Sequence, residues 1–135
     1  MADLSQTPGN VKLVAGTAAL VGTAGEALTQ GQPAYEASGK WYRCDANDTA
    51  AKANCRVIVL TPAATDEQVV LARAGSDVNL GATLAVGTVY VVSANVGAIA
   101  PVADLTTNDY VTILGVAKTA AVLAFNPVVS GVQKA

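Results

Sequence analysis

The stretch that decides the fold reads Gly81-Ala-Thr-Leu84-Ala-Val-Gly87-Thr-Val-Tyr90-Val-Val-Ser93. Its first part carries glycines at turn spacing, and glycine accepts the positive φ angles that tight turns require. Its second part is a run of β-branched and aromatic residues, which favour an extended strand. The stretch therefore predicts a turn that leads directly into a strand.

An earlier part of the chain repeats this frame. Gly25-Glu-Ala-Leu28-Thr-Gln-Gly31 has the same G-x-x-L-x-x-G spacing, and a tyrosine follows each copy within four residues, Tyr35 and Tyr90. A second similarity occurs at a spacing of 54 residues, where Val57, Val59, Leu60, Ala63 and Thr65 recur as Val111, Ile113, Leu114, Ala117 and Thr119. These repeats predict two related β units of roughly 55 residues. The alternative is chance similarity in a chain rich in Ala, Val, Gly and Thr, and the strand order of the two units decides between them.

The composition limits the classes of partner. A chain of 135 residues is most simply one domain. With one Trp, one Phe and four Tyr, large core residues are scarce, which favours a thin, sheet-rich fold or a core completed by oligomerisation. The net charge is −2, and no cluster of Lys and Arg is present to neutralise phosphates, so nucleic acid is not an expected partner.

One uncharged segment is long enough to cross a bilayer as a helix. It spans residues 78–103 and contains three glycines, one proline and the strand-favouring run Thr88–Val92, so we do not expect a membrane span. The N-terminal sequence Met1-Ala-Asp-Leu-Ser5 has no basic region of the kind that opens a signal peptide, and we do not expect secretion by that route.

Short β segments recur at the spacing of about 8–12 residues that is typical of sandwiches and barrels. One short helix is predicted at about 46–53, because Asp45 can cap its first turn and its alanines favour helix. Residues 1–10 are polar and turn-rich, and they predict a flexible, extended N-terminal arm. The expected fold is therefore all-β, a small barrel or sandwich formed by one domain over residues 11–135.

Few groups are suited to catalysis. The chain has no His, the commonest general base. Its paired carboxylates stand where Asp and Glu normally cap helices or form turns, namely Asp45/Asp48, Asp66/Glu67 and Asp104/Asp109. Neither glycine frame is followed by the Gly-Lys-Ser/Thr of a phosphate-binding loop. We predict a protein that is not an enzyme and that has no catalytic residues, metal or cofactor.

Two cysteines, Cys44 and Cys55, enclose ten residues. A disulfide between them would close a short loop and add about 2–3 kcal/mol to stability. Two free, buried thiols in a protein made in a reducing cytoplasm are the favoured interpretation, and the disulfide stays open as the alternative. The neighbouring Trp41 and Tyr42 are either an exposed interface anchor or, as we favour, part of the core.

Several further segments follow the opening stretch in a fixed order, namely Gly97-Ala-Ile-Ala-Pro101, Asp104-Leu105, Tyr110-Val-Thr-Ile-Leu-Gly-Val-Ala117 and Ser130-Gly131-Val132. Together with 84–93, this pattern of turns and strands resembles the head decoration, or cement, proteins of tailed bacteriophages. The regions 25–35 and 45–46 fit the same layout, and the likeness is strongest over 80–135. Cys44 and Cys55 depart from the family pattern.

The resemblance implies a β-rich virion protein, made in the host cytoplasm and often trimeric, on the outer surface of the capsid. Such a protein bridges neighbouring subunits of the major capsid protein and stabilises the expanded head against the pressure of packaged DNA. Residues 1–10 could then order on the capsid by adding a strand to a sheet edge. The alternative is a receptor- or glycan-binding module of a head fibre, tail fibre or spike, which would use Trp41 and Tyr42.

Overall fold

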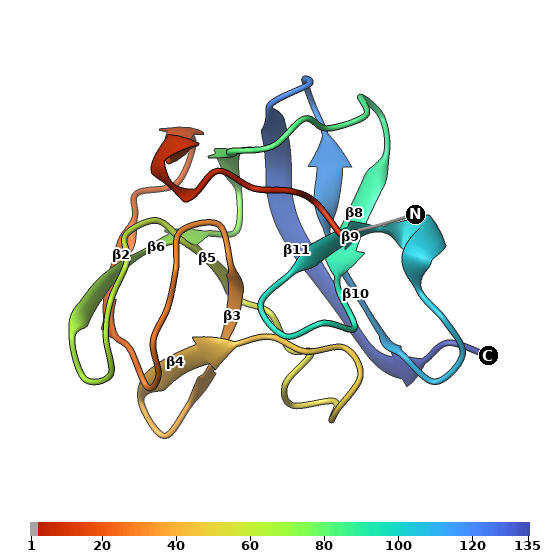
Figure 1. The fold of residues 1–135 in the computed structure, drawn as a ribbon, viewed down its shortest axis with the longest axis horizontal. Coiled ribbons are helices and arrows are strands. Elements are labelled where there is room, and N and C mark those ends of the chain that lie inside the picture. Colours follow the sequence, from red (N-terminus) through yellow and green to blue (C-terminus); the bar gives the residue numbers. More distant parts are fainter. Residues whose placement is uncertain (1–2) are drawn as a thin grey trace.

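The computed structural model describes residues 3–135, which form eleven strands and two short 3-10 helices (Figure 1). In chain order they are η1 (Pro8–Asn10), β1 (Val11–Ala15), β2 (Leu20–Thr23), β3 (Pro33–Ala37), β4 (Lys40–Arg43), β5 (Val57–Val59), β6 (Gln68–Arg73), β7 (Ser76–Leu80), β8 (Val89–Val92), β9 (Ile99–Pro101), η2 (Val102–Asp104), β10 (Tyr110–Ala117) and β11 (Val122–Gln133). The all-β prediction is confirmed. In this part of the chain no helix is long and apolar enough to cross a membrane.

The strands form two antiparallel sheets that lie side by side in Figure 1. One has the order β2-β6-β5-β3-β4, and the other has the order β1-β7-β11-β10-β8-β9. Apart from the added β1, the two orders are the same when β2–β6 are matched in sequence with β7–β11. We call β2–β6 the first unit and β7–β11 the second unit. The predicted pair of related β units is therefore present in the fold.

The pairing registers of the two units also agree. Ala34 lies opposite Val57 in the first unit, and Tyr90 lies opposite Gly115 in the second. The other ladders follow the same plan, with Pro33–Ile58 matched by Val89–Val116, Val59–Leu71 by Ala117–Leu123, and Leu20–Leu71 by Val78–Leu123. Matching order and matching register together exclude a chance resemblance confined to composition.

The leucines of the two G-x-x-L-x-x-G frames occupy the same position in their units. Leu28 and Leu84 are both buried. The backbone N–H of Leu28 donates to the carbonyl of Ala63 at 2.8 Å, and that of Leu84 donates to the carbonyl of Ala120 at 2.7 Å. Each frame thus connects the loop before β3 or β8 to the loop between the last two strands of the same unit, β5 and β6 or β10 and β11.

The closing glycines of the frames correct part of the predicted repeat. Gly31 and Gly87 have positive φ angles of 89° and 83°, as turns require. Their N–H groups donate to the carbonyls of Val59 and Ala117, at 2.8 and 2.9 Å. Val59 therefore corresponds to Ala117, and the predicted match of Val59 with Ile113, at a spacing of 54, is wrong by four residues.

The two tyrosines that follow the frames are not equivalent. Tyr90 takes the place of Ala34 in the register, so its ring fills the interior of the second unit at 2% exposure. Tyr35 is only partly buried and stacks on Tyr42, with ring centroids 5.8 Å apart. The equal spacing of the two tyrosines from their frames is therefore a coincidence, because Tyr90 lies inside its unit and Tyr35 lies at the surface of its own.

The two units close their sheets differently. In the first unit Gly25 donates its backbone N–H to the carbonyl of Trp41 at 2.8 Å, so the sheet curls into a small barrel whose edges meet. In the second unit the N-terminal arm fills the gap between the edges. Leu4 donates to the carbonyl of Ile99 at 2.8 Å, and Thr7 donates to that of Gly81 at 2.6 Å. Of the predicted arm, residues 3–10 thus run along the second unit, and residues 1 and 2 lie outside the described part.

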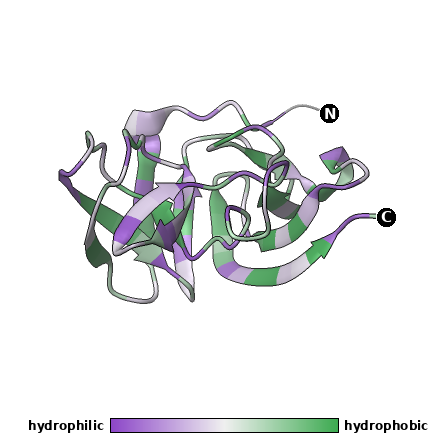
Figure 2. Ribbon diagram, turned by 90° about the horizontal axis from the view of Figure 1, so that it is seen from below, coloured by the Kyte–Doolittle hydropathy of each residue, from purple (hydrophilic) through white to green (hydrophobic). Residues whose placement is uncertain are grey.

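Two clusters of buried side chains form the core, and one of them contains residues of both units. One cluster of buried side chains fills the first barrel, including Trp41 and Leu71. The other joins Ile58 and Cys44 of the first unit to the interior of the second, including Phe125. Figure 2 shows the hydrophobic residues concentrated in the strands of both sheets. The second cluster therefore packs the two units against each other.

The predicted helix at about 46–53 is wrong. The segment forms turns, and only the N–H of Ala53 reaches the carbonyl four residues back, that of Thr49, at 3.2 Å. Ala46 instead donates to the carbonyl of Ser93 at 3.0 Å and accepts from the N–H of Tyr110 at 2.8 Å. A helix of two turns is costly to nucleate, and these contacts with the second unit hold the backbone outside helical geometry.

Candidate functional site

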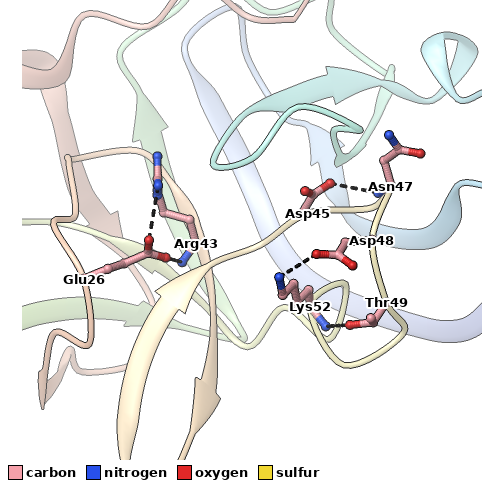
Figure 3. Close-up of polar contacts among 7 residues, drawn as sticks. All are labelled: Glu26, Arg43, Asp45, Asn47, Asp48, Thr49 and Lys52. Carbon is pink, nitrogen blue, oxygen red and sulfur yellow. Dashed lines mark hydrogen bonds and ion pairs between the residues drawn. The ribbon is translucent and has the colours of Figure 1, made fainter.

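The predicted carboxylate pairs lie in turns and ion pairs. The carboxylate of Asp45 accepts from the N–H of Asn47 at 2.8 Å, and Asp48 pairs with Lys52 (Figure 3). The others behave alike, with Asp66 paired to Lys40, Glu67 accepting from the N–H of Ala64, Asp109 accepting from Thr106, and Asp104 ending η2. Carboxylates held this way stabilise loops. No group of three His, Cys, Asp or Glu suited to a metal occurs among residues 3–135.

One carboxylate inside the first glycine frame has a structural role that the sequence did not reveal. Glu26 accepts from the backbone N–H of Arg43 at 2.8 Å and from its guanidinium at 3.1 Å (Figure 3). This double contact fastens the frame to the end of β4. Glu26 positions the guanidinium of Arg43, and the Cδ of the same side chain lies against Gly97 of the second unit.

Cys44 and Cys55 are fully buried free thiols in this structure. The thiol of Cys55 donates to the carbonyl of Val57 at 3.4 Å. Burial, followed by the contact with Cys55, raises the pKa of Cys44 well above its usual value of 9.0. The two thiols are neighbours in the cluster that contains residues of both units. They are not bonded in this structure, and a disulfide between them stays a prediction.

Trp41 and Tyr42, predicted as core or as an exposed interface anchor, differ in burial. Trp41 is 6% exposed and belongs to the interior of the first barrel, which is the favoured interpretation. One side of its indole is covered by Gly22, where an added Cβ would lie 2.6 Å from Nε1. Tyr42 remains partly exposed, stacked on Tyr35.

The second unit has an exposed apolar edge. β11 pairs with β7 only over Val122–Phe125, and from there to Gln133 its described ladder is with β10 alone. We call the paired residues 110–113 and 128–133 the C-terminal ribbon, which runs toward the C-terminus in Figure 1. The β11 half of the ribbon carries no charge and exposes three valines, Val128, Val129 and Val132. A strand edge of this kind is a template for association with another chain.

The docked arm lies between two polar hollows on the second unit. One has a volume of about 530 Å³ between the arm and the start of β1 and end of β7, and includes Thr7, Lys12 and Asn79. The other, of about 490 Å³, separates the arm from the loop after β8, and there Asp3 accepts from the hydroxyl of Ser93 at 2.6 Å. These polar contacts hold the arm together with the packing of Leu4 against the core.

Comparison of the chain with protein-family models, with curated proteins and with solved structures found no match. The C-terminal ribbon is the candidate binding surface of the described chain, because it combines an open strand edge with exposed apolar side chains.

Proposed function

We propose that this protein is a structural protein of a tailed-bacteriophage virion, which binds the outer surface of the capsid. There it bridges neighbouring subunits of the major capsid protein and stabilises the expanded head. The resemblance over 80–135 supplies this class of function. The observation that carries it in the structure is the C-terminal ribbon, whose Val128 and Val132 are 56% and 62% exposed on an uncharged strand.

The ribbon suits a protein that works by extended contact. Burying exposed valines removes apolar surface from water, and an open strand edge adds directional hydrogen bonds to that gain. Association through the same edge, or through the adjoining valines, would also bring copies of the chain together, and we propose a trimer as the assembled form. The carboxylates held in turns and ion pairs fit a binding protein better than a hydrolase.

The proposal is tested by mixing the purified protein with bare expanded capsids and imaging them. Saturable density at regular positions of the capsid lattice is expected, with little binding to unexpanded heads, whose surface lattice differs. Irregular or absent density on expanded capsids would refute the proposal. A mass measurement in solution shows whether the trimer exists before it meets the capsid.

A receptor- or glycan-binding module is the second candidate, and the partly exposed Tyr35–Tyr42 stack is the observation in its favour. The support is weaker because Trp41, the larger aromatic, is in the core and covered by Gly22. Binding to a glycan array without binding to capsids would favour this candidate over the first.

A further inference from the structure

A hollow lies at one end of the first barrel. Its volume is about 290 Å³, the share of roughly ten water molecules in the liquid. Its walls come from β2, β4, β5, β6 and the adjoining loops, and they comprise Thr17, Leu20, Trp41, Arg56, Val57, Arg73 and Ala74. The hollow can accept a single side chain but not an element of secondary structure.

The two units carry different residues at the end of the barrel where the hollow lies. Arg73 lies opposite Val57, as Phe125 lies opposite Gly115 in the second unit. Phe125 is 1% exposed inside its unit, whereas Arg73 is exposed at the matching position. Along β6 Arg73 alternates with the buried Val69 and Leu71, so it stands on the strand face that lines the barrel. The second unit thus has the buried ring of Phe125 at the position where the first unit has the exposed, charged side chain of Arg73.

A second cation lies at the same end of the barrel. Arg56 directly precedes Val57, whereas the residue that directly precedes Gly115 in the second unit is Leu114, which is fully buried. The guanidinium of Arg73 is oriented by its Nε, which donates to the carbonyl of Ala18 at 2.9 Å. The ion pairs of the described chain use Lys40, Arg43, Lys52 and Lys118, so among residues 3–135 no carboxylate is paired with Arg56 or Arg73.

Trp41 adds a hydrogen-bond donor, its indole N–H, to the lining of the hollow. The indole N–H of Trp41 donates to no acceptor among the described residues, and Trp41 lines the hollow. Gly22 packs against the indole near this nitrogen, since a Cβ added there would lie 2.6 Å from Nε1. The hollow therefore combines two guanidinium groups, one N–H donor and the apolar walls of Leu20 and Val57.

We infer that this hollow binds the carboxylate side chain of an acidic residue on a partner protein. Arginine forks match the two oxygens of a carboxylate, and charge-assisted bonds of this kind are stronger than neutral ones. The apolar walls suit the methylene groups of Glu or Asp. A sugar ring would need an exposed aromatic ring, and Trp41 is only 6% exposed. That the partner is the major capsid protein rests on the proposed function, but the carboxylate site itself does not.

The test uses the whole protein and its single tryptophan, whose indole N–H gives one NMR resonance. We expect a saturable shift of this resonance with blocked glutamate at constant ionic strength, and none with blocked glutamine, its neutral counterpart. Arg56→Gln and Arg73→Gln should each weaken binding about tenfold, because each removes a charged donor. Lys12→Gln, which removes a charge from a different hollow, should leave binding unchanged.

Several outcomes would overturn the inference. An indole resonance that does not move, or that moves equally with blocked glutamine, would remove the carboxylate site. Tighter binding of inorganic phosphate would reassign the hollow to phosphate, and tighter binding of N-acetylneuraminic acid would reassign it to a glycan. The same spectra report whether each variant is folded. Since no capsid enters the experiment, its result is independent of the test of the proposed function.

Discussion

Leu4 donates its backbone N–H to the carbonyl of Ile99 at 2.8 Å, and this bond takes the place of the one from Gly25 to Trp41 in the first unit. The N-terminal arm is therefore the closing segment of the second unit. In the first unit the chain that follows β2 closes the sheet by itself. The second unit uses a segment from the other end of the sequence for the same purpose.

Gln6 is the residue of the arm whose loss should cost most. Its side-chain amide donates to the carbonyls of Gly31 and Leu80, both at 3.0 Å, and so joins the two units. Gln6→Ala leaves both carbonyls without this donor, and we expect a loss of about 1–3 kcal/mol in the free energy of unfolding. Chemical denaturation measures it. Ser5→Ala, at an exposed neighbouring position, is the control and should change stability little. Equal effects of the two variants would contradict this role.

The two frame glycines should respond differently to alanine. Both have positive φ, which costs an L-residue roughly 1–2 kcal/mol. At Gly87 a Cβ meets open space, whereas at Gly31 it would lie 2.5 Å from Nε2 of Gln6 and displace that side chain. We expect Gly31→Ala to be the more destabilising variant in denaturant. The difference in destabilisation between Gly31→Ala and Gly87→Ala should be smaller when Gln6 is also replaced by Ala. An unchanged difference would show that the Gln6 side chain is not its cause.

Arg73→Phe should plug the first barrel as Phe125 plugs the second. Burying the ring against Leu20 and Val57 is expected to raise the free energy of unfolding by about 1–2 kcal/mol. The same variant should lose the response of the Trp41 resonance to blocked glutamate. Arg73→Gln is the control, since it removes the charge without filling the space. A destabilised Arg73→Phe would mean that the two units differ in shape at this end.

A charge on the C-terminal ribbon should abolish capsid binding. Val128 is 56% exposed, so Val128→Lys should leave the fold intact while placing an unpaired cation in the proposed contact. We expect binding to expanded heads to weaken at least about tenfold, measured as occupancy against protein concentration. Val21→Lys is a matched control, because Val21 is 55% exposed on β2 of the first unit. Normal occupancy with Val128→Lys would place the contact elsewhere.

Alkaline pH should destabilise the protein through Cys44. Burial raises the pKa of its thiol above the unfolded value of 9.0, so the neutral thiol is favoured in the folded state. This contribution is complete below pH 9.0 and is lost as the pH rises from there toward the folded pKa. Melting temperatures measured across this range should fall less steeply for Cys44→Ala than for the parent protein. Parallel slopes for the two proteins would exclude the thiol as the cause.

Local sequence signals predicted the strands but could not predict their pairing. The β-branched run before Ser93 was identified because side-chain type acts over a few residues. The repeated glycine frame was identified for the same reason. The match at a spacing of 54 failed because the residues between strands differ in number in the two units, and register depends on backbone hydrogen bonds rather than on composition.

The failed helix and the unpredicted hollow have a common origin. Alanines near Ala46 favour helix locally, but Ser93 and Tyr110 hold this backbone in turns from the other unit. In the same way Arg56 and Arg73 are far apart in sequence and meet only because β5 pairs with β6. No window of sequence contains both partners of such contacts.

The sequence by itself determined the all-β class, the duplicated glycine frame and the use of acidic residues in turns, because each depends on conformational preferences within a few residues. The tertiary structure alone decided that the arm closes the second unit, that Phe125 plugs one barrel and Arg73 leaves the other open, and that the ribbon keeps a free edge. These features follow from long-range pairing and packing, whose free energy is gained only when distant segments are brought together.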